Sequence, residues 1–167
     1  MKKPKPRLDI PPRSNDNRKP KLYEVMDTEA LAALFDGMTY EGSSKHKQLP
    51  HLFGLEPFRG DRGDRTLCDR HAAFRPSDFA RVPRMLARAR AASLVGNFIW
   101  TVDDNGWIYE LAITNAGLNQ YHGYPLRPSE AIAEKVFIRF HAWAELHGEV
   151  EDVAAARACR NFYGFRS

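Results

Sequence analysis

The chain has 167 residues, of which 43% are hydrophobic, and this composition predicts one folded domain rather than a wholly disordered chain. The formal net charge of +4 at pH 7 favours an anionic partner, RNA or DNA first. Two cysteines are too few for a disulfide framework, and no apolar run approaches the ~20 residues of a membrane span. A signal peptide requires an apolar segment after its basic start, and no such segment follows the basic N-terminus here. We therefore predict a cytoplasmic protein with no membrane partner.

The first part of the chain predicts a tail and a short helix. Residues 1–21 are rich in Lys, Arg and Pro, which predicts a disordered basic tail before a single domain over 22–167. A helix is expected over 29–35, capped at its start by Asp27 or Thr28 and ended by Gly37. A short strand is expected over 39–41.

A long irregular segment is predicted from residue 42 to about residue 76. It contains two successive Gly-Asp-Arg triplets, at 60–62 and 63–65, which predict turns. A loop of this length inside a compact domain is usually functional or disordered.

Pro83 predicts the first turn of a helix that runs to Val95 and ends at Gly96. Arg81, Arg84 and Arg88 follow a three-to-four spacing along one face of this helix. Such a stripe either tracks a phosphate backbone or is a solvated face, and the sequence favours neither.

Asn105-Gly106 lies between two alternating segments, 98–104 and 107–114, and predicts a β-hairpin with a two-residue turn. That turn would place Trp100 opposite Leu111 on the core face. The other face would then be partly polar, with Thr101, Glu110 and Thr114, and available as a working surface.

The C-terminal part predicts one strand and two helices. Residues 121–126 are expected to form a strand or an extended edge, followed by a helix from Ser129 to His147 and a last helix over 151–161. The expected fold is α+β: a small antiparallel sheet containing the 98–114 hairpin, packed on several helices.

Lys45-His46-Lys47 carries the most specific chemical signal. The like charge of two flanking lysines lowers the proton affinity of the histidine between them, so its ring can stay neutral and accept a proton. The lysines themselves can hold a phosphate. Metal-free RNA cleavage needs a second group for the leaving oxygen, for which His122 and Glu110 are the candidates. A solvated basic loop is the alternative interpretation.

Further residues are candidates for RNA contact. Hydroxyl groups of Ser43, Ser44 and Thr114 can bind phosphate, the arginines can guide the strand, and Tyr121 and Tyr124 flank His122 and can stack on bases.

Cys68 and His71 are three residues apart and suggest either a zinc site or a catalytic thiol. A zinc site needs three or four ligands, and no paired cysteines complete one. No phosphate-binding glycine loop is present in the sequence. We therefore predict no metal and no cofactor.

Lys45-His46-Lys47 followed by Leu52-Phe53-Gly54-Leu55 resembles the Lys-His and Phe-Gly signature of colicin D-like toxin domains. These domains belong to the barnase–EndoU–colicin–RelE group of metal-independent endoribonucleases. The resemblance implies that His46 is the catalytic acid/base and that Lys45 and Lys47 contact phosphate. It also implies an acidic inhibitor protein as a partner.

The sequence therefore predicts a toxin-like, metal-independent endoribonuclease that cleaves RNA, with tRNA as one candidate substrate. A non-catalytic nucleic-acid-binding or regulatory protein is the alternative, and an interaction protein with incidental charge is a third interpretation.

Overall fold

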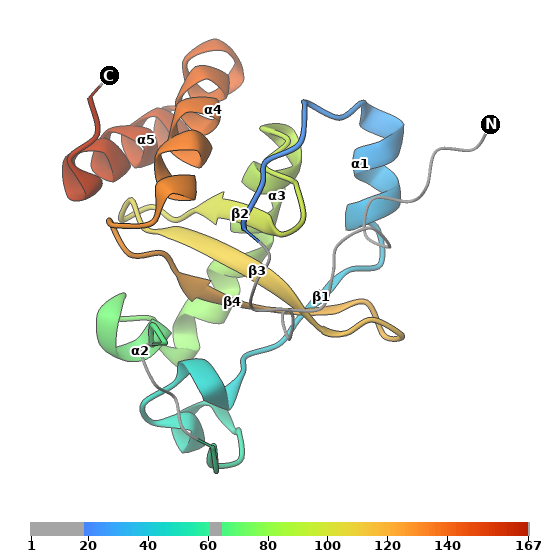
Figure 1. The fold of residues 1–167 in the computed structure, drawn as a ribbon, viewed down its shortest axis with the longest axis vertical. Coiled ribbons are helices and arrows are strands. Elements are labelled where there is room, and N and C mark those ends of the chain that lie inside the picture. Colours follow the sequence, from blue (N-terminus) through green and yellow to red (C-terminus); the bar gives the residue numbers. More distant parts are fainter. Residues whose placement is uncertain (1–18, 61–64, 167) are drawn as a thin grey trace.

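The fold is given by a computed structural model that describes residues 19–60 and 65–166. Within these ranges four strands form one sheet in the order β1-β4-β3-β2 (Figure 1). The strands are β1 (Thr39–Tyr40), β2 (Ile99–Val102), β3 (Ile108–Asn115) and β4 (Gln120–Pro125). The helices are α1 (Thr28–Phe35), α2 (Cys68–His71), α3 (Val82–Ala91), α4 (Ala131–His147) and α5 (Val150–Tyr163), with short 3₁₀ helices η2 (Ser44–His46), η3 (Pro50–Phe53) and η4 (Pro76–Arg81).

The predicted α+β class is confirmed, with two changes to the sheet. Strands β2, β3 and β4 are antiparallel as expected, but β1 pairs with β4 in parallel, so the sheet is mixed. Because β1 adds to its outer side, β4 lies inside the sheet rather than at its edge. The 121–126 segment therefore has a strand on each side.

The predicted register of the hairpin is wrong by one residue. Val102 pairs with Ile108 and Trp100 pairs with Glu110, instead of Leu111. The amide of Gly106 donates to Asp103 O and the amide of Asp103 donates to Trp107 O, which makes a three-residue turn with Gly106 at φ +90°. A glycine in the left-handed region after a type I turn is the usual form of this longer loop.

This shift decides which side chains share a face, because paired residues on neighbouring strands point the same way. One face, called here the Glu110 face, carries Trp100, Glu110, His122 and Tyr124. The opposite face, called the Thr101 face, carries Ile99, Thr101, Leu111 and Tyr121. The expected partly polar face with Thr101 beside Glu110 does not form.

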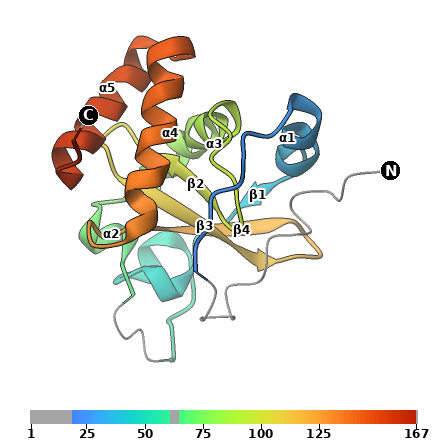
Figure 2. The ribbon, with the colours of Figure 1, turned by 45° about the horizontal axis from the view of Figure 1, so that its top comes forward.

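Helices cover both faces, so the expectation of an open working surface on the hairpin is also wrong. On the Thr101 face, α1 and α3 pack in one cluster with Ile99, Leu111 and Tyr121, and Thr101 Oγ1 donates to Met85 O of α3. On the Glu110 face, α4 packs on β2 and β3 (Figure 2), in the same apolar cluster as Trp100. All four residues of β2 are buried as a result.

The helix predictions are confirmed in their positions, with differences at the ends. Asp27 caps α1 by accepting from Ala30 N, as expected. Helix α3 ends at Ala91, not Val95, and the chain leaves it through Ser93 at φ +54°. Helix α4 begins after Glu130 rather than Ser129, and α5 extends from Val150 to Tyr163.

The predicted tail over 1–21 lies mostly outside the described residues, but its last part is paired with the domain. Asn97 Nδ2 donates to Lys19 O, and the amide of Lys21 donates to Asn97 Oδ1. A Cβ on Gly96 would come 1.7 Å from Lys21 O, so only glycine permits this approach. Residues 61–64, which form the larger part of the two Gly-Asp-Arg triplets, also lie outside the described residues.

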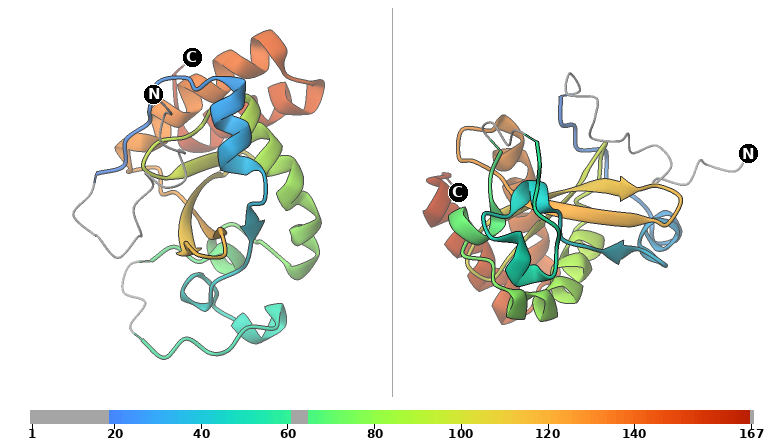
Figure 3. Two further views of the ribbon diagram at one scale, coloured as in Figure 1. Left: turned by 90° about the vertical axis from the view of Figure 1, so that its right-hand side faces the viewer. Right: turned by 90° about the horizontal axis from the view of Figure 1, so that it is seen from below.

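The arrangement separates two ends of the molecule. Helices α4 and α5 lie together at one end, and the segment with η2, η3 and α2 lies at the opposite end, below β4 in Figure 1. Figure 3 shows α3 along one side of the sheet, with α1 beside it. No helix in the described part of the chain is both long and apolar enough to cross a bilayer.

Candidate functional site

The first part of the candidate site is a row of side chains across three strands of the Glu110 face. Trp100 pairs with Glu110, and Glu110 pairs with Tyr124. Trp100 Nε1 donates to Glu110 Oε1 at 3.0 Å, and the Tyr124 hydroxyl donates to Glu110 Oε2. Glu110 is only 4% exposed, so a buried carboxylate holds both rings in place.

His122 occupies the next position along the same face. It pairs with Ala112 on β3, and its Nδ1 lies 2.7 Å from Thr114 Oγ1. This contact fixes the plane of the imidazole ring. His122 is 7% exposed, whereas Thr114 lies at the exposed end of β3.

His46 reaches this face from outside the sheet. It ends the one-turn helix η2, and its ring stacks on Tyr124 at 4.6 Å and on His122 at 5.4 Å between centroids. The sequence predicted His46, His122 and Glu110 as candidates, and the structure brings all three into one cluster through Tyr124. We call His46, His122, Tyr124 and Glu110 the histidine cluster.

The hydrogen bonding of His46 identifies its tautomer. Nδ1 lies 3.0 Å from Thr66 O, and a carbonyl oxygen can only accept. Nδ1 therefore carries the hydrogen, and in the neutral ring the basic nitrogen is Nε2. The His46 side chain is 1% exposed, so the ring is held rigidly between the loop and the sheet.

The two lysines beside His46 differ in their surroundings. Lys45 is exposed, as a phosphate contact requires. Lys47 is 0% exposed, and its Nζ lies 4.9 Å from the Phe53 ring centre and 5.3 Å from that of Phe74. Lys47 thus packs into an aromatic box, where it makes cation–π contacts rather than reaching a ligand at the surface.

The predicted hydroxyl contacts are placed around the same turn. Ser43 O accepts from His46 N and Ser44 O accepts from Lys47 N, so both serines shape η2 through their backbones. Both side chains are half-buried.

Tyr121 and Tyr124 were predicted to stack on RNA bases, but both side chains are buried. Tyr121 is on the Thr101 face, where it packs with α1 and α3. Tyr124 is on the Glu110 face, buried against His46. Because strand neighbours point to opposite faces, Tyr121 cannot join the cluster that Tyr124 and His122 form.

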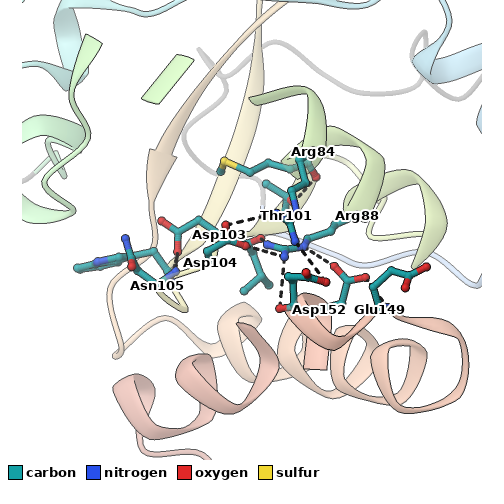
Figure 4. A network of polar contacts seen from close by, with 12 residues as sticks. Arg84, Arg88, Thr101, Asp103, Asp104, Asn105, Glu149 and Asp152 are labelled. Carbon is teal, nitrogen blue, oxygen red and sulfur yellow. Dashed lines mark hydrogen bonds and ion pairs between the residues drawn. The ribbon is translucent and has the colours of Figure 1, made fainter. Parts of the chain in front are cut away.

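The predicted arginine stripe separates into exposed and buried members. Arg88 Nε donates to Asp152 Oδ1 at 2.7 Å, its Nη2 donates to Asp104 Oδ1 at 2.7 Å, and its Nη1 donates to Val102 O at 3.0 Å (Figure 4). This buried network joins α3, the hairpin turn and α5. Arg88 is therefore unable to guide an RNA strand, and its role is structural.

Arg81 and Arg84 remain on the surface. Arg81 lies 3.5 Å from Asp78, and Arg84 lies 3.8 Å from Asp104 and 3.9 Å from Glu151. Both side chains are about half exposed, so these ion pairs are weak and can exchange for a phosphate.

Cys68 and His71 have separate hydrogen-bond partners. Cys68 Sγ donates to Gly123 O at 3.1 Å, whereas His71 Nδ1 accepts from Leu67 N at 2.8 Å. Burial raises the pKa of the Cys68 thiol more than the nearby Lys47 lowers it, which disfavours a reactive thiolate. Within 19–60 and 65–166, no three His, Cys, Asp or Glu side chains gather as a metal site would need.

Trp100 and the carbonyl of Thr66 are hydrogen-bond partners of the histidine cluster that the sequence did not reveal. The shifted hairpin register hid Trp100, because the expected pairing put it opposite Leu111. A signal for it existed, since Asp103 and Gly106 also allow a three-residue turn. No sequence pattern indicates that Thr66, twenty residues from His46, supplies the acceptor.

We found no match for this chain among protein-family models, curated proteins or solved structures.

The cluster places two imidazoles in contact, each fixed by a separate hydrogen bond. Two histidines can divide proton removal and proton donation between them. The buried carboxylate of Glu110 accepts from Trp100 and Tyr124 and so orients these two rings.

Proposed function

We propose that this protein is a metal-independent, toxin-like endoribonuclease whose acid/base pair is His46 and His122. The observation that carries the proposal is the stacked pair itself, with ring centres 5.4 Å apart and each ring fixed by its own hydrogen bond. Histidines held in this way near a basic surface are suited to proton transfer near pH 7.

The proposed reaction uses the 2′-hydroxyl of the RNA as its nucleophile. His46 Nε2 takes the proton of this hydroxyl, whose oxygen bonds to the adjacent phosphorus, and the bond from phosphorus to the 5′-oxygen breaks. His122 gives its proton to that leaving oxygen, and the products are a 2′,3′-cyclic phosphate and a 5′-hydroxyl end. No water or metal is consumed, and each such proton transfer contributes about 10²–10⁴-fold to the rate.

The remaining residues of the cluster have supporting roles in this proposal. Glu110 is assigned to positioning, because its two oxygens hold Trp100 and Tyr124. Lys45 is the preferred phosphate contact, because it is exposed whereas Lys47 is enclosed by Phe53 and Phe74. Thr114 orients His122.

Substrate access requires movement around the cluster. His46 and His122 are 1% and 7% exposed, so a strand reaches both rings only when the groups that cover them move aside. A buried site of this kind fits a nuclease that opens on binding a structured RNA such as tRNA. A producing cell would need an acidic inhibitor protein to hold such an enzyme inactive.

The test is incubation of the full chain with total RNA and with tRNA in EDTA, wild type beside His46→Ala. We expect cleavage by wild type and a loss of about 10²–10⁴-fold in the variant. His51→Ala is the matched control, since His51 is an exposed histidine of the neighbouring helix η3. Equal cleavage by wild type and His46→Ala would exclude the proposed mechanism.

The burial of both imidazoles favours one second candidate, a non-catalytic RNA-binding or regulatory protein. In that case RNA would bind at the exposed cations, Lys45, Arg81 and Arg84, and not at the rings. Binding that falls steeply with salt, with no cleavage by wild type at any pH, would establish this alternative.

A further inference from the structure

An open groove of about 260 Å³ lies along the segment that follows His46 and has no role in the chemistry proposed above. Residues from η3, from α2 and from the segment before η4 line it, among them Gln48, Leu52, Phe53, Asp69, Phe74 and Arg75. Its volume is just below the ~300–1,000 Å³ of pockets that enclose drug-sized ligands. It is therefore suited to one flat group, not to a large ligand.

The wall of this groove is aromatic. Phe53 and Phe74 are stacked with centroids 6.2 Å apart, and Phe53 is only half-buried. The buried Lys47 Nζ lies 4.9 Å from the centre of the Phe53 ring. A supported, partly open ring of this kind is a stacking platform for a nucleobase, and such stacking contributes about 1–3 kcal/mol per base.

Asp69 provides a fixed acceptor on the groove. Its Oδ1 accepts from Gln48 N at 2.8 Å and its Oδ2 accepts from Leu49 N at 2.9 Å, so the backbone determines the orientation of the carboxylate. Arg70 N also donates to Oδ1, at 2.9 Å. Since a carboxylate offers about four acceptor positions, Oδ2 retains capacity for a ligand donor.

An acceptor-only group discriminates among the four bases. The Watson–Crick edge of guanine carries two neighbouring N–H donors, N1–H and N2–H₂. Adenine, cytosine and uracil each place an acceptor beside their donor, and that acceptor would face the negative carboxylate. The carboxylate therefore favours guanine.

The position of the groove fits a base next to the scissile phosphate. Gln48 lies two residues after His46, at most about 8 Å along the chain. Lys47 lies between them and contacts the two aromatic rings of the groove. Arg75 is exposed at the groove and supplies a positive charge for a neighbouring phosphate.

We propose that this groove binds one nucleobase of the RNA strand, with a preference for guanine set by Asp69. This inference rests on the proposed ribonuclease function, because it assigns the groove to the substrate of the histidine cluster. Asp69 is thus a specificity-determining residue, and Phe53 is the stacking partner.

The first measurement is calorimetric or NMR titration of the full chain with the 3′-monophosphates of guanosine, adenosine, cytidine and uridine. We expect guanosine monophosphate to bind at least about tenfold more tightly than the others, the effect of ~1.4 kcal/mol. Leu52→Asp places a negative charge on an exposed side chain of the groove and should weaken all binding about tenfold. Leu146→Asp, at an exposed leucine of α4 outside the groove, is the matched control.

The second measurement is the ratio of cleavage at guanine to cleavage at other bases, for wild type and Asp69→Asn. We expect the ratio to fall toward one in the variant, even if its overall rate also changes. The inference is overturned if the four mononucleotides bind equally, or if Leu52→Asp does not weaken their binding. If the wild type still cleaves RNA in that case, the proposed function remains intact. Selective guanosine monophosphate binding without any RNA cleavage supports the groove and removes the ribonuclease proposal.

Discussion

Two buried polar clusters lie at different places in this protein, and they differ in how their charges are compensated. Around Arg88, a cation meets two carboxylates and a carbonyl at 2.7–3.0 Å. In the histidine cluster, the His46 ring stacks on both His122 and Tyr124, and the one carboxylate accepts from Tyr124.

The difference indicates what each cluster is for. A buried cation with matched carboxylates is fixed in one charge state, and it ties α3 to α5 and to the hairpin turn. Imidazoles change charge near neutral pH, so a buried pair of them can take up and release protons. The Arg88 cluster is thus a stabilising contact, and the histidine cluster is where the proposed function places the proton transfers.

The largest effect is expected for His122→Ala. If His122 is the acid of the proposed reaction, RNA cleavage should fall about 10²–10⁴-fold, and one limb of the pH–rate profile should disappear. The profile of initial cleavage rates in EDTA is the measurement. The control is His141→Ala, at a partly exposed histidine of α4, which should cleave RNA as fast as wild type. An unchanged cleavage rate in His122→Ala would remove His122 from the mechanism.

The next largest effect is expected for Arg88→Ala, and it concerns stability. Asp152 would remain buried without its cation, which typically costs about 3–5 kcal/mol of unfolding free energy. Urea unfolding measures this loss. Arg90→Ala is the matched control, because the Arg90–Asp36 pair is exposed and is worth less than about 1 kcal/mol. If Arg88→Ala loses no more unfolding free energy than Arg90→Ala does, the Arg88 cluster does not have the stabilising role argued above.

Glu110→Gln should have an intermediate effect. Glutamine offers only one acceptor oxygen, so either Trp100 Nε1 or the Tyr124 hydroxyl loses its acceptor, at a cost of about 1–3 kcal/mol. If Glu110 only positions Tyr124, cleavage should fall less than in His122→Ala and both limbs of the pH–rate profile should remain. Glu134→Gln, on the exposed side of α4, is the control. A loss as large as that of His122→Ala would instead identify Glu110 as the second catalytic group.

The smallest effect is expected at Asp103, in the hairpin turn beside the Arg88 cluster. Burial raises the pKa of this carboxyl to about 6, and the amides of Trp107 and Asn105 oppose the rise. Since the folded pKa lies above the unfolded value of about 3.9, the native state binds more protons between these values. The contribution of Asp103 to stability is thus full below about pH 4 and is lost as the pH rises through about 6.

Asp103→Asn tests this directly. The variant has no proton to lose, so its stability relative to wild type should rise between pH 4 and pH 7 in urea unfolding. Asp36→Asn, at an exposed aspartate, should show no such rise. A constant difference between Asp103→Asn and wild type across this range would contradict the prediction.

Much of the fold was predictable from local patterns. Asp27 and Gly37 marked the two ends of α1 as expected, and local patterns located α3, α4 and α5. The hairpin was located but its register was not, because Asn105-Gly106 suits a two-residue turn as well as the three-residue turn that forms. A shift of one residue moved Glu110 from an expected polar face to a buried row beside Trp100.

The candidate site was predictable in its residue types but not in its partners. Lys45-His46-Lys47 indicated a histidine with basic neighbours, yet only the packing of η2 places Lys45 in solvent and Lys47 among Phe53 and Phe74. Arg88 looked like Arg84 in a helical stripe. The carboxylates that bury it come from Asp104 and Asp152, and no local pattern connects these to α3.

The sequence by itself determined the α+β class and the positions of most elements, because periodicity and helix caps are local properties. Only the tertiary structure decided the mixed sheet, the register, the burial of Glu110 and Arg88, and the contact of His46 with His122. These depend on contacts between segments far apart in the chain, and each is selected by how well the two surfaces pack and how fully their polar groups are paired.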